Sequence, residues 1–389
     1  MKTESAASGK PSNGARGLTR AVRFIAYALV GLLVGWAAGR YRAGVSETGP
    51  AAALREARQL YAAGRAEAAL RRLAALARDQ RWGAEAVFWM GRIRWEQGYW
   101  AEAESYWWEV LNRRPDYAEA VWALLRLYER ELRVEDSERL VLKAWPYEPD
   151  LVNRQMLLFQ VLVQQYEEPA VESLAKELQR VVRIEPTNPY AVDALAYCYA
   201  RLGRGADALA LLMEHLERMP SSAVWRLQLR LAEVLLESGR AQQVQELLEG
   251  LMLQDDPAAQ ARRAWLHGRS WEMNGAPKRA LKAYREAVRL APAEYRYRFA
   301  LARCLRLLGD EQEALEQERL VALYRRARLE LVRLFRKVYA RRGPSPLDCK
   351  RIADAYRRLH KDALAALWEE LSAQLRTPDA FSARTGDNG

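Results

Sequence analysis

A period close to 34 residues constrains this 389-residue chain more strongly than any other feature of its sequence. Six prolines follow one another at intervals of 34, 37, 34, 37 and 35 residues: Pro115, Pro149, Pro186, Pro220, Pro257 and Pro292. Glycines recur at intervals of 34 to 36 residues within two runs: Gly64 and Gly98, then Gly203, Gly239, Gly275 and Gly309. A period that persists over this length predicts a stack of similar units, each packed mainly on its neighbours.

Each unit contains two stretches with helical periodicity, which predicts pairs of helices. Alanines recur where paired helices would cross closely: Ala57, Ala69, Ala103, Ala208, Ala280 and Ala314. We expect the glycine to end the first helix of a unit in a left-handed turn and the proline to end the second. The expected fold class is therefore all-α.

The unit from Ala84 to Tyr117 resembles the tetratricopeptide repeat (TPR) family. Its matching positions are Gly91, Gly98, Ala103, Val110 and Pro115, with Trp107 at a large aromatic position. Units at 189–220, 261–292 and 295–324 also match, whereas those near 50–83, 118–151, 155–188 and 225–257 match less well. In the 118–151 unit, Leu132 and Ser137 stand in place of the turn glycine and the small residue. A divergent unit over 345–376 closes the array.

The resemblance implies a right-handed α-solenoid of about eight to nine helix-turn-helix repeats over residues 51–376, more than 80% of the chain. It also implies that one stripe of each first helix lines a concave groove for protein or peptide partners. Aromatic and arginine side chains occupy these positions: Phe88, Arg92, Trp95, Trp122, Arg126, Arg130, Tyr190, Tyr197, Arg201, Trp265, Arg269, Phe299, Arg303 and Arg306. Both side-chain types are enriched at binding hot spots, although an ordinary arginine-rich solvent face has the same composition.

An apolar run near the N-terminus predicts a membrane segment. Residues 24–39 carry no charge between Arg23 and Arg40, and sixteen residues of helix span about 24 Å. We predict a transmembrane signal anchor over 21–41, with a cleaved signal peptide or a buried helix as alternatives. Within it, Gly31, Gly35 and Gly39 form a small-residue row that suits contact with a second transmembrane helix, hence a homodimer, although glycine is common in such helices.

The flanking charge predicts the orientation of this anchor. The polar stretch 1–20 is basic and too poor in apolar residues to fold, so we expect a disordered cytoplasmic tail. A linker over 42–50 leads to an extracytoplasmic solenoid, and 377–389 forms a second disordered tail. The expected location is a bacterial inner (cytoplasmic) membrane, crossed once.

The remaining motifs argue against enzyme chemistry. The string Gly203–Ala208 matches a dinucleotide-binding pattern but follows a helical stretch, so it is interpreted as a repeat turn. Three cysteines without a CxxC pair rule out a disulfide scaffold or zinc ribbon, and the three histidines are widely separated. We therefore expect no catalytic residues, cofactor, metal or small-molecule substrate.

A basic stretch from residue 319 to residue 342 contains nine basic residues and one acid, Glu330. Its apolar stripe predicts a long amphipathic helix that meets anionic lipid or an acidic partner, or a solvated capping face. The function expected of the whole chain is a membrane-anchored scaffold for protein or peptide partners in cell-envelope assembly. The alternatives are the same fold with its repeats in the cytoplasm, or a nucleic-acid-binding helical-repeat protein.

Overall fold

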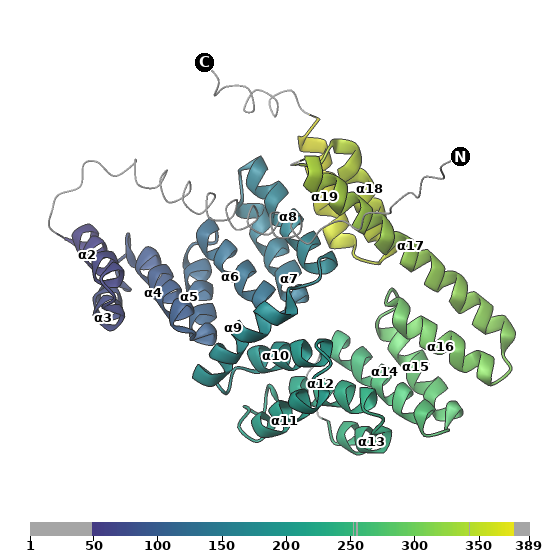
Figure 1. Cartoon of the computed structure of the whole chain (residues 1–389). Coiled ribbons are helices and arrows are strands. Elements are labelled where there is room, and N and C mark those ends of the chain that lie inside the picture. The colour runs from purple at the N-terminus through teal and green to yellow at the C-terminus, as the bar shows by residue number, and fades with distance from the viewer. Residues whose placement is uncertain (1–48, 252, 254–255, 342, 377–389) are drawn as a thin grey trace, which may run out of the picture. The chain divides into compact units, whose positions relative to one another are not determined.

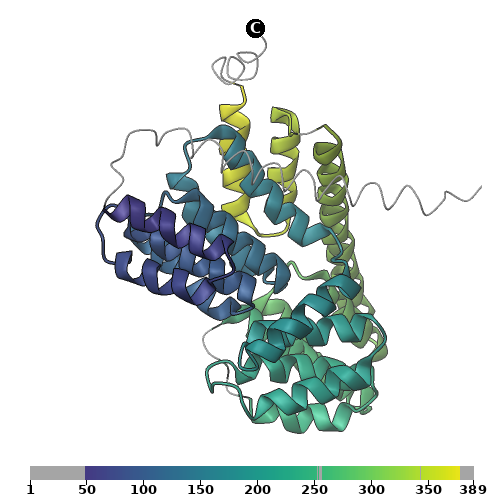
Figure 2. The same cartoon turned by 60° about the vertical axis from the view of Figure 1, so that its left-hand side comes forward.

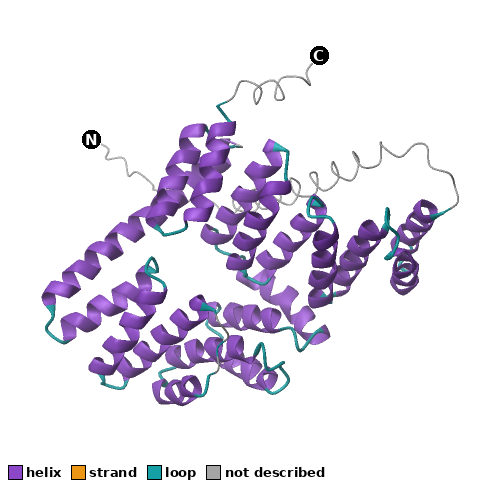
Figure 3. Ribbon diagram, turned by 180° about the vertical axis from the view of Figure 1, so that it is seen from behind, coloured by secondary structure: helices purple, strands orange, loops and turns teal. Residues whose placement is uncertain are grey.

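The computed structural model describes residues 49–376 except 252, 254, 255 and 342. These residues form eighteen α-helices and one short 3-10 helix, and no strand occurs among them (Figure 3). This confirms the all-α prediction. The predicted anchor, its Gly31, Gly35 and Gly39, and both predicted tails lie outside the described residues. No helix in the described part of the chain is both long enough and apolar enough to cross a membrane.

The chain divides into two units, Met1–Arg72 and Leu73–Gly389. The first contains α2 (Pro50–Ala62) and most of α3 (Ala66–Leu76), joined by an ion pair of 2.7 Å between Arg72 and Glu56. The helices up to the middle of the second unit are α4 (Gly83–Gln97), α5 (Trp100–Arg113), α6 (Ala118–Arg130), α7 (Val134–Ala144), α8 (Leu151–Tyr166), α9 (Val171–Ile184), α10 (Pro189–Arg201) and α11 (Gly205–Leu216) (Figure 1). The remaining helices are α12 (Val224–Glu237), α13 (Ala241–Glu249), α14 (Pro257–Met273), α15 (Pro277–Leu290), α16 (Tyr295–Leu307), α17 (Glu311–Arg341), α18 (Pro346–Arg358) and α19 (Asp362–Gln374).

The turns inside the hairpins have the predicted left-handed geometry. Every glycine of the periodic series has a positive φ, from 72° at Gly275 to 96° at Gly98. Leu132, which replaces the glycine in the 118–151 unit, also adopts a φ of 57°. A leucine in this region costs about 1–2 kcal/mol relative to glycine, so this turn is held by its surroundings.

The small residues lie where large aromatic side chains of the second helix pack. A Cβ atom at Gly91 would be 2.6 Å from Nε1 of Trp107, and one at Gly268 would be 2.4 Å from the Tyr284 ring. Trp107 and Tyr284 are buried, and so is Ala103. The α4–α5 and α14–α15 hairpins therefore close around an aromatic ring that uses the space of the absent side chain.

Two expectations need correction. Pro257 does not end a second helix but begins α14, where its missing N–H is harmless. The second helix of the 295–324 unit and the basic stretch are not separate, because α17 runs unbroken for 31 residues. The closing unit is confirmed as the α18–α19 hairpin, and a capping box between Ser345 and Asp348 begins α18.

The stacking changes partner at α8. This helix does not form a hairpin with α9; it packs against α7, α17 and α19 (Figures 1 and 2). The Phe159 and Phe335 rings stack with centroids 5.4 Å apart, and the Tyr356 hydroxyl donates to Gln165 at 2.7 Å. Trp145 Nε1 donates to Glu370 at 2.7 Å. The last three helices therefore cover apolar surface on helices nearly two hundred residues earlier in the chain.

Helix α9 instead packs beside the turns of the earlier hairpins. The side chain of Ile184 reaches Gly98, where an added Cβ would be 2.7 Å from its Cδ1 atom. The Ala101 amide donates to the Glu185 carboxylate at 3.0 Å. The hairpins that follow α8 therefore begin with a helix, α9, that packs against the turns of the hairpins that precede α8.

We expect Gly91→Ala to lower the free energy of unfolding by about 1–3 kcal/mol, because the added methyl group displaces the Trp107 indole. The matched control is Gly205→Ala, a helical glycine with no atom within 4 Å of an added Cβ. This control should be neutral or stabilising by up to about 1 kcal/mol. Urea denaturation measures both values, and equal effects of the two substitutions would contradict the proposed crossing.

Candidate partner-binding surface

Three arginines of the predicted groove come together on neighbouring first helices. Arg92 lies on α4, and Arg126 and Arg130 lie on α6. We call these three residues the arginine cluster. The pKa of Arg126 is lowered, first because surrounding protein displaces water from its guanidinium and next because of the charge of Arg92. Glu129 opposes this shift, and Arg130 adds to it.

The members of the arginine cluster differ in how they are neutralised. Arg92 bonds Glu96 at 3.3 Å and lies over the Trp89 ring. Arg130 lies 3.6 Å from Glu177. Among the residues that the structure describes, no carboxylate is within ion-pair distance of Arg126. Arg126 is thus a solvent-accessible cation with a nearby cation and no direct acidic partner.

A second group of predicted residues meets on α14 and α16. Arg269 lies over the Trp265 ring, with its guanidinium carbon 5.1 Å from the centroid, and this ring packs on Tyr297 at 5.5 Å. Arg303 pairs with Glu272 at 2.7 Å, so its charge is already neutralised. Phe299 is 53% exposed and is the one aromatic side chain of the predicted set that is largely open to solvent.

The other predicted aromatic residues serve packing within the array. Trp95 stacks on Trp100 with centroids 4.4 Å apart, and Phe88 contacts the Tyr117 ring at 5.4 Å. Trp122 is half-buried against the core. The remaining predicted positions are Tyr190 and Tyr197, which face arginines of α12, and Arg201 and Arg306, which pair with glutamates.

A ladder of charged side chains, absent from the predicted set, crosses three first helices. Asp193 on α10 accepts from Arg230 on α12 at 2.8 Å, and Glu233 on α12 accepts from Arg262 on α14 at 2.7 Å. Arg230 also bonds Glu233 at 2.7 Å, which completes the row. Burial opposes the charge of Asp193, but Arg230 holds its pKa below the ordinary value. The four charges satisfy one another, so the ladder fixes the register of these helices and leaves no charge for a partner.

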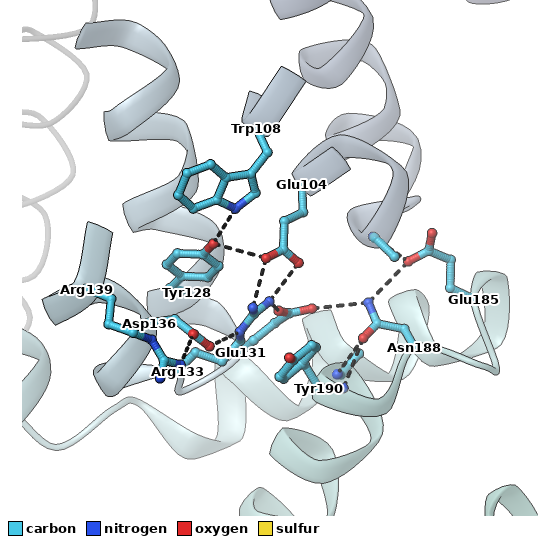
Figure 4. Close-up of polar contacts among 12 residues, drawn as sticks. Glu104, Trp108, Tyr128, Glu131, Arg133, Asp136, Arg139, Glu185, Asn188 and Tyr190 are labelled. Atoms are coloured by element: carbon cyan, nitrogen blue, oxygen red, sulfur yellow. Dashed lines mark hydrogen bonds and ion pairs between the residues drawn. The ribbon is translucent and has the colours of Figure 1, made fainter. Parts of the chain in front are cut away.

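A buried arginine was also missed by sequence reasoning. Arg133, at the start of α7, donates to Glu104 at 2.8 Å, Glu131 at 2.9 Å and Asp136 at 2.7 Å (Figure 4). Although burial disfavours its charge, bonds and charges from these carboxylates raise its pKa. The only sequence signal was an unusual turn, in which Leu132 replaces glycine between two charged residues.

A tyrosine ring on α6 flanks Arg133, and a second tyrosine and an asparagine extend this group to the start of α10. The Arg133 guanidinium carbon lies 4.3 Å from the Tyr128 centroid and 3.5 Å from that of Tyr190. The Asn188 amide donates to Glu131 at 3.1 Å, while its oxygen caps α10 (Figure 4). We call these residues, with Arg133 and its three carboxylates, the junction cluster, because they join the α6–α7 turn to α10.

The junction cluster holds a carboxyl group with an unusual proton affinity. Burial raises the pKa of Glu131 from 4.5 to about 7, although the charge of Arg133 opposes the shift. Glu104 contributes to the rise as a like charge. Glu131 therefore titrates near neutral pH at the point where two parts of the array meet.

The cysteines and acidic residues provide no reactive or metal-binding site in the described ranges. Cys198, Cys304 and Cys349 are buried and free, and burial raises the pKa of the Cys349 thiol to about 12. No group of three or more His, Cys, Asp or Glu side chains there could hold a metal ion. The described surface thus offers guanidinium and apolar groups for binding.

The hairpins, their period and their close crossings define a TPR-like helical-repeat protein. No family model matches the chain, and no curated protein matches it. Among solved structures, "MamA 41-end from Desulfovibrio magneticus RS-1" is 21% identical, with 45% of this chain and 96% of that chain covered and a TM-score of 0.35. "Human IFIT1 dimer with PPP-AAAA" is 16% identical, with 82% and 89% covered and a TM-score of 0.38.

The proton affinity of Glu131 predicts a pH-dependent stability. Because its folded pKa is raised, its contribution is complete below pH 4.5 and is lost as the pH rises through about 7. Between about pH 5 and pH 8, wild type should therefore lose stability relative to Glu131→Gln. Urea denaturation at each pH measures the difference in the free energy of unfolding between wild type and Glu131→Gln. Burial lowers the pKa of His267, which has the opposite effect on stability, but His267 is present in both proteins and its effect cancels in the difference.

The matched control is Glu135→Gln, which removes an exposed acid from the first turn of α7, four residues further along the chain. Its difference from wild type should stay constant over the same pH range. A constant difference for Glu131→Gln would show that Glu131 is ionised throughout and would contradict the assignment.

Proposed function

We propose that this chain is a non-enzymatic scaffold that binds an acidic segment of a protein partner on the first-helix face around the arginine cluster. The observation that carries the proposal is the state of Arg126. It is accessible, it has lost part of its hydration, and its neighbour Arg92 is a like charge. A carboxylate placed there would relieve the repulsion and accept bidentate hydrogen bonds.

The rest of the charged surface supports the choice of this site. The charged ladder is internally neutral, and Arg303 is already paired with Glu272. A partner that bound there would have to replace an existing ion pair. At Arg126 the partner would gain a new ion pair. An exposed ion pair contributes about 0.2–1 kcal/mol, and a pair at Arg126 should contribute more, because water is already displaced from this guanidinium.

We expect acidic peptides to bind through Arg126. Random peptides displayed on phage and selected on the full-length chain in detergent should be enriched in Asp and Glu. Arg126→Glu should weaken the selected peptides at least tenfold, because repulsion replaces attraction. Fluorescence anisotropy measures the dissociation constants, and added salt should weaken wild-type binding.

The matched control is Arg289→Glu, a charge reversal of an exposed arginine on a second helix. It should leave the dissociation constants unchanged. If Arg126→Glu and Arg289→Glu lost the same amount of affinity, the loss would come from the lower net charge of the protein, and a site at Arg126 would be refuted. Selection of RNA over peptides in competition would favour a nucleic-acid partner instead.

The membrane anchor over 21–41 and the extracytoplasmic location remain part of this proposal. Their support is the uncharged run 24–39 and the basic stretch before it. An alkaline phosphatase fused after Arg376 should be active and stay in the membrane fraction. An inactive fusion would place the repeats in the cytoplasm, and an active soluble one would indicate cleavage.

A further inference from the structure

An open cavity of about 720 Å³ lies along the basic stretch of α17 and is bordered on one side by Arg351 of α18; the arginine cluster does not share it. Its charged lining consists of five cations and one acid: Arg325, Arg326, Arg333, Lys337, Arg351 and Glu330. The net charge is therefore +4. Its apolar lining includes Leu334, which is buried, and Leu329, which is 55% exposed.

Two of the cations have no partner of their own among the described residues. Lys337 bonds Asp348 at 2.5 Å, and Arg351 lies 3.7 Å from Glu330. Within the described ranges, no acid, carbonyl oxygen or aromatic ring pairs with Arg326 or Arg333. Seven residues of helix separate these two arginines, or about 10.5 Å along the axis.

Leu329 lies between the two unpaired arginines, three residues after Arg326 and four before Arg333. These spacings place all three side chains on one face of α17. A partner helix with two acids seven residues apart and a leucine between them would match this face. Its acids would pair with Arg326 and Arg333, and its leucine would contact Leu329. Such a helix would lie alongside α17 with its charges opposite those of the cavity.

We infer that this basic cavity docks an acidic amphipathic helix of a protein partner. The shape and lining favour this occupant over other anions. The exposed Leu329 offers an apolar contact between the two arginines that a lipid headgroup does not fill, and no aromatic ring lines the cavity to stack on a nucleic-acid base. A volume of this size holds several side chains of a docked helix. The inference goes beyond the function proposed above, because the two surfaces have no residue in common.

The test uses the full-length chain in detergent and a fluorescent helical peptide with Glu residues seven apart and Leu between them. A scrambled peptide of the same composition is the second probe. We expect the designed peptide to bind at least tenfold more tightly than the scrambled one. The double variant Arg326→Glu, Arg333→Glu should lose at least tenfold in affinity, and Leu329→Ala should weaken binding severalfold.

The matched control is Arg319→Glu, an exposed arginine on the same helix that does not line the cavity. Circular dichroism and thermal melting should be unchanged in the arginine variants, because the replaced arginines make no ion pair within the described ranges, and nearly unchanged in Leu329→Ala, because this leucine is exposed. Arg126→Glu should leave binding of this peptide intact, and the double variant should leave binding at Arg126 intact, so the two proposals can fail separately. Equal binding of both peptides, equal losses in Arg319→Glu and the double variant, or displacement of the peptide by phosphatidylglycerol vesicles or single-stranded RNA would each overturn the inference.

Discussion

The absence of a side chain at Gly91 and Gly268 is the constraint on which the well-matched hairpins depend. Each glycine lets the facing aromatic ring of the second helix enter the space between the two backbones. A hairpin closed in this way still leaves apolar surface on both flanks, since two helices cannot bury their stripes on each other alone. Every hairpin therefore needs a neighbour, which is why the chain is an array and why each interruption of the array must be compensated elsewhere.

Helix α8 is the place where that compensation is visible. Its chain continues into α9, which packs beside the turns of earlier hairpins instead of returning along α8. The apolar surface of α8 is covered by α17 and α19. Because α17 is 31 residues long, it reaches α8 and brings α19 beside it. Contacts between residues nearly two hundred positions apart give this part of the array the long-range connectivity of a globular domain. A repeat array without them would lose its units one by one, whereas here the C-terminal helices and α7–α8 stabilise one another.

The fold could be predicted from the sequence to the extent that it depends on local periodicity. The turn glycines, the crossing residues and the α18–α19 unit all follow from residues within one or two repeats. The separation of α8 from α9 could not be predicted, because the period continues unbroken through 155–188. What changes there is the partner of each helix, and this is decided by long-range contacts such as the one between Phe159 and Phe335.

The predicted binding residues divide for the same reason. A spacing rule identifies which face of a helix a residue occupies, but not whether a neighbouring helix supplies an aromatic ring or a carboxylate to it. Trp95 therefore stacks on Trp100, and Arg303 pairs with Glu272, whereas no carboxylate of the described residues lies within ion-pair distance of Arg126. In a chain so rich in arginine, the residues that can bind a partner are those that internal ion pairs leave over. The arginines of the charged ladder and of the junction cluster are paired with carboxylates inside the array. Because these pairs are largely buried, their charges are not accessible to a partner. Arg126 on one surface, and Arg326 and Arg333 on another, are accessible arginines that no ion pair among the described residues neutralises. An external anion at these positions would add a charge pair without breaking one. What sets them apart from other exposed arginines is the nearby Arg92 charge at Arg126 and the shared pocket lining at Arg326 and Arg333.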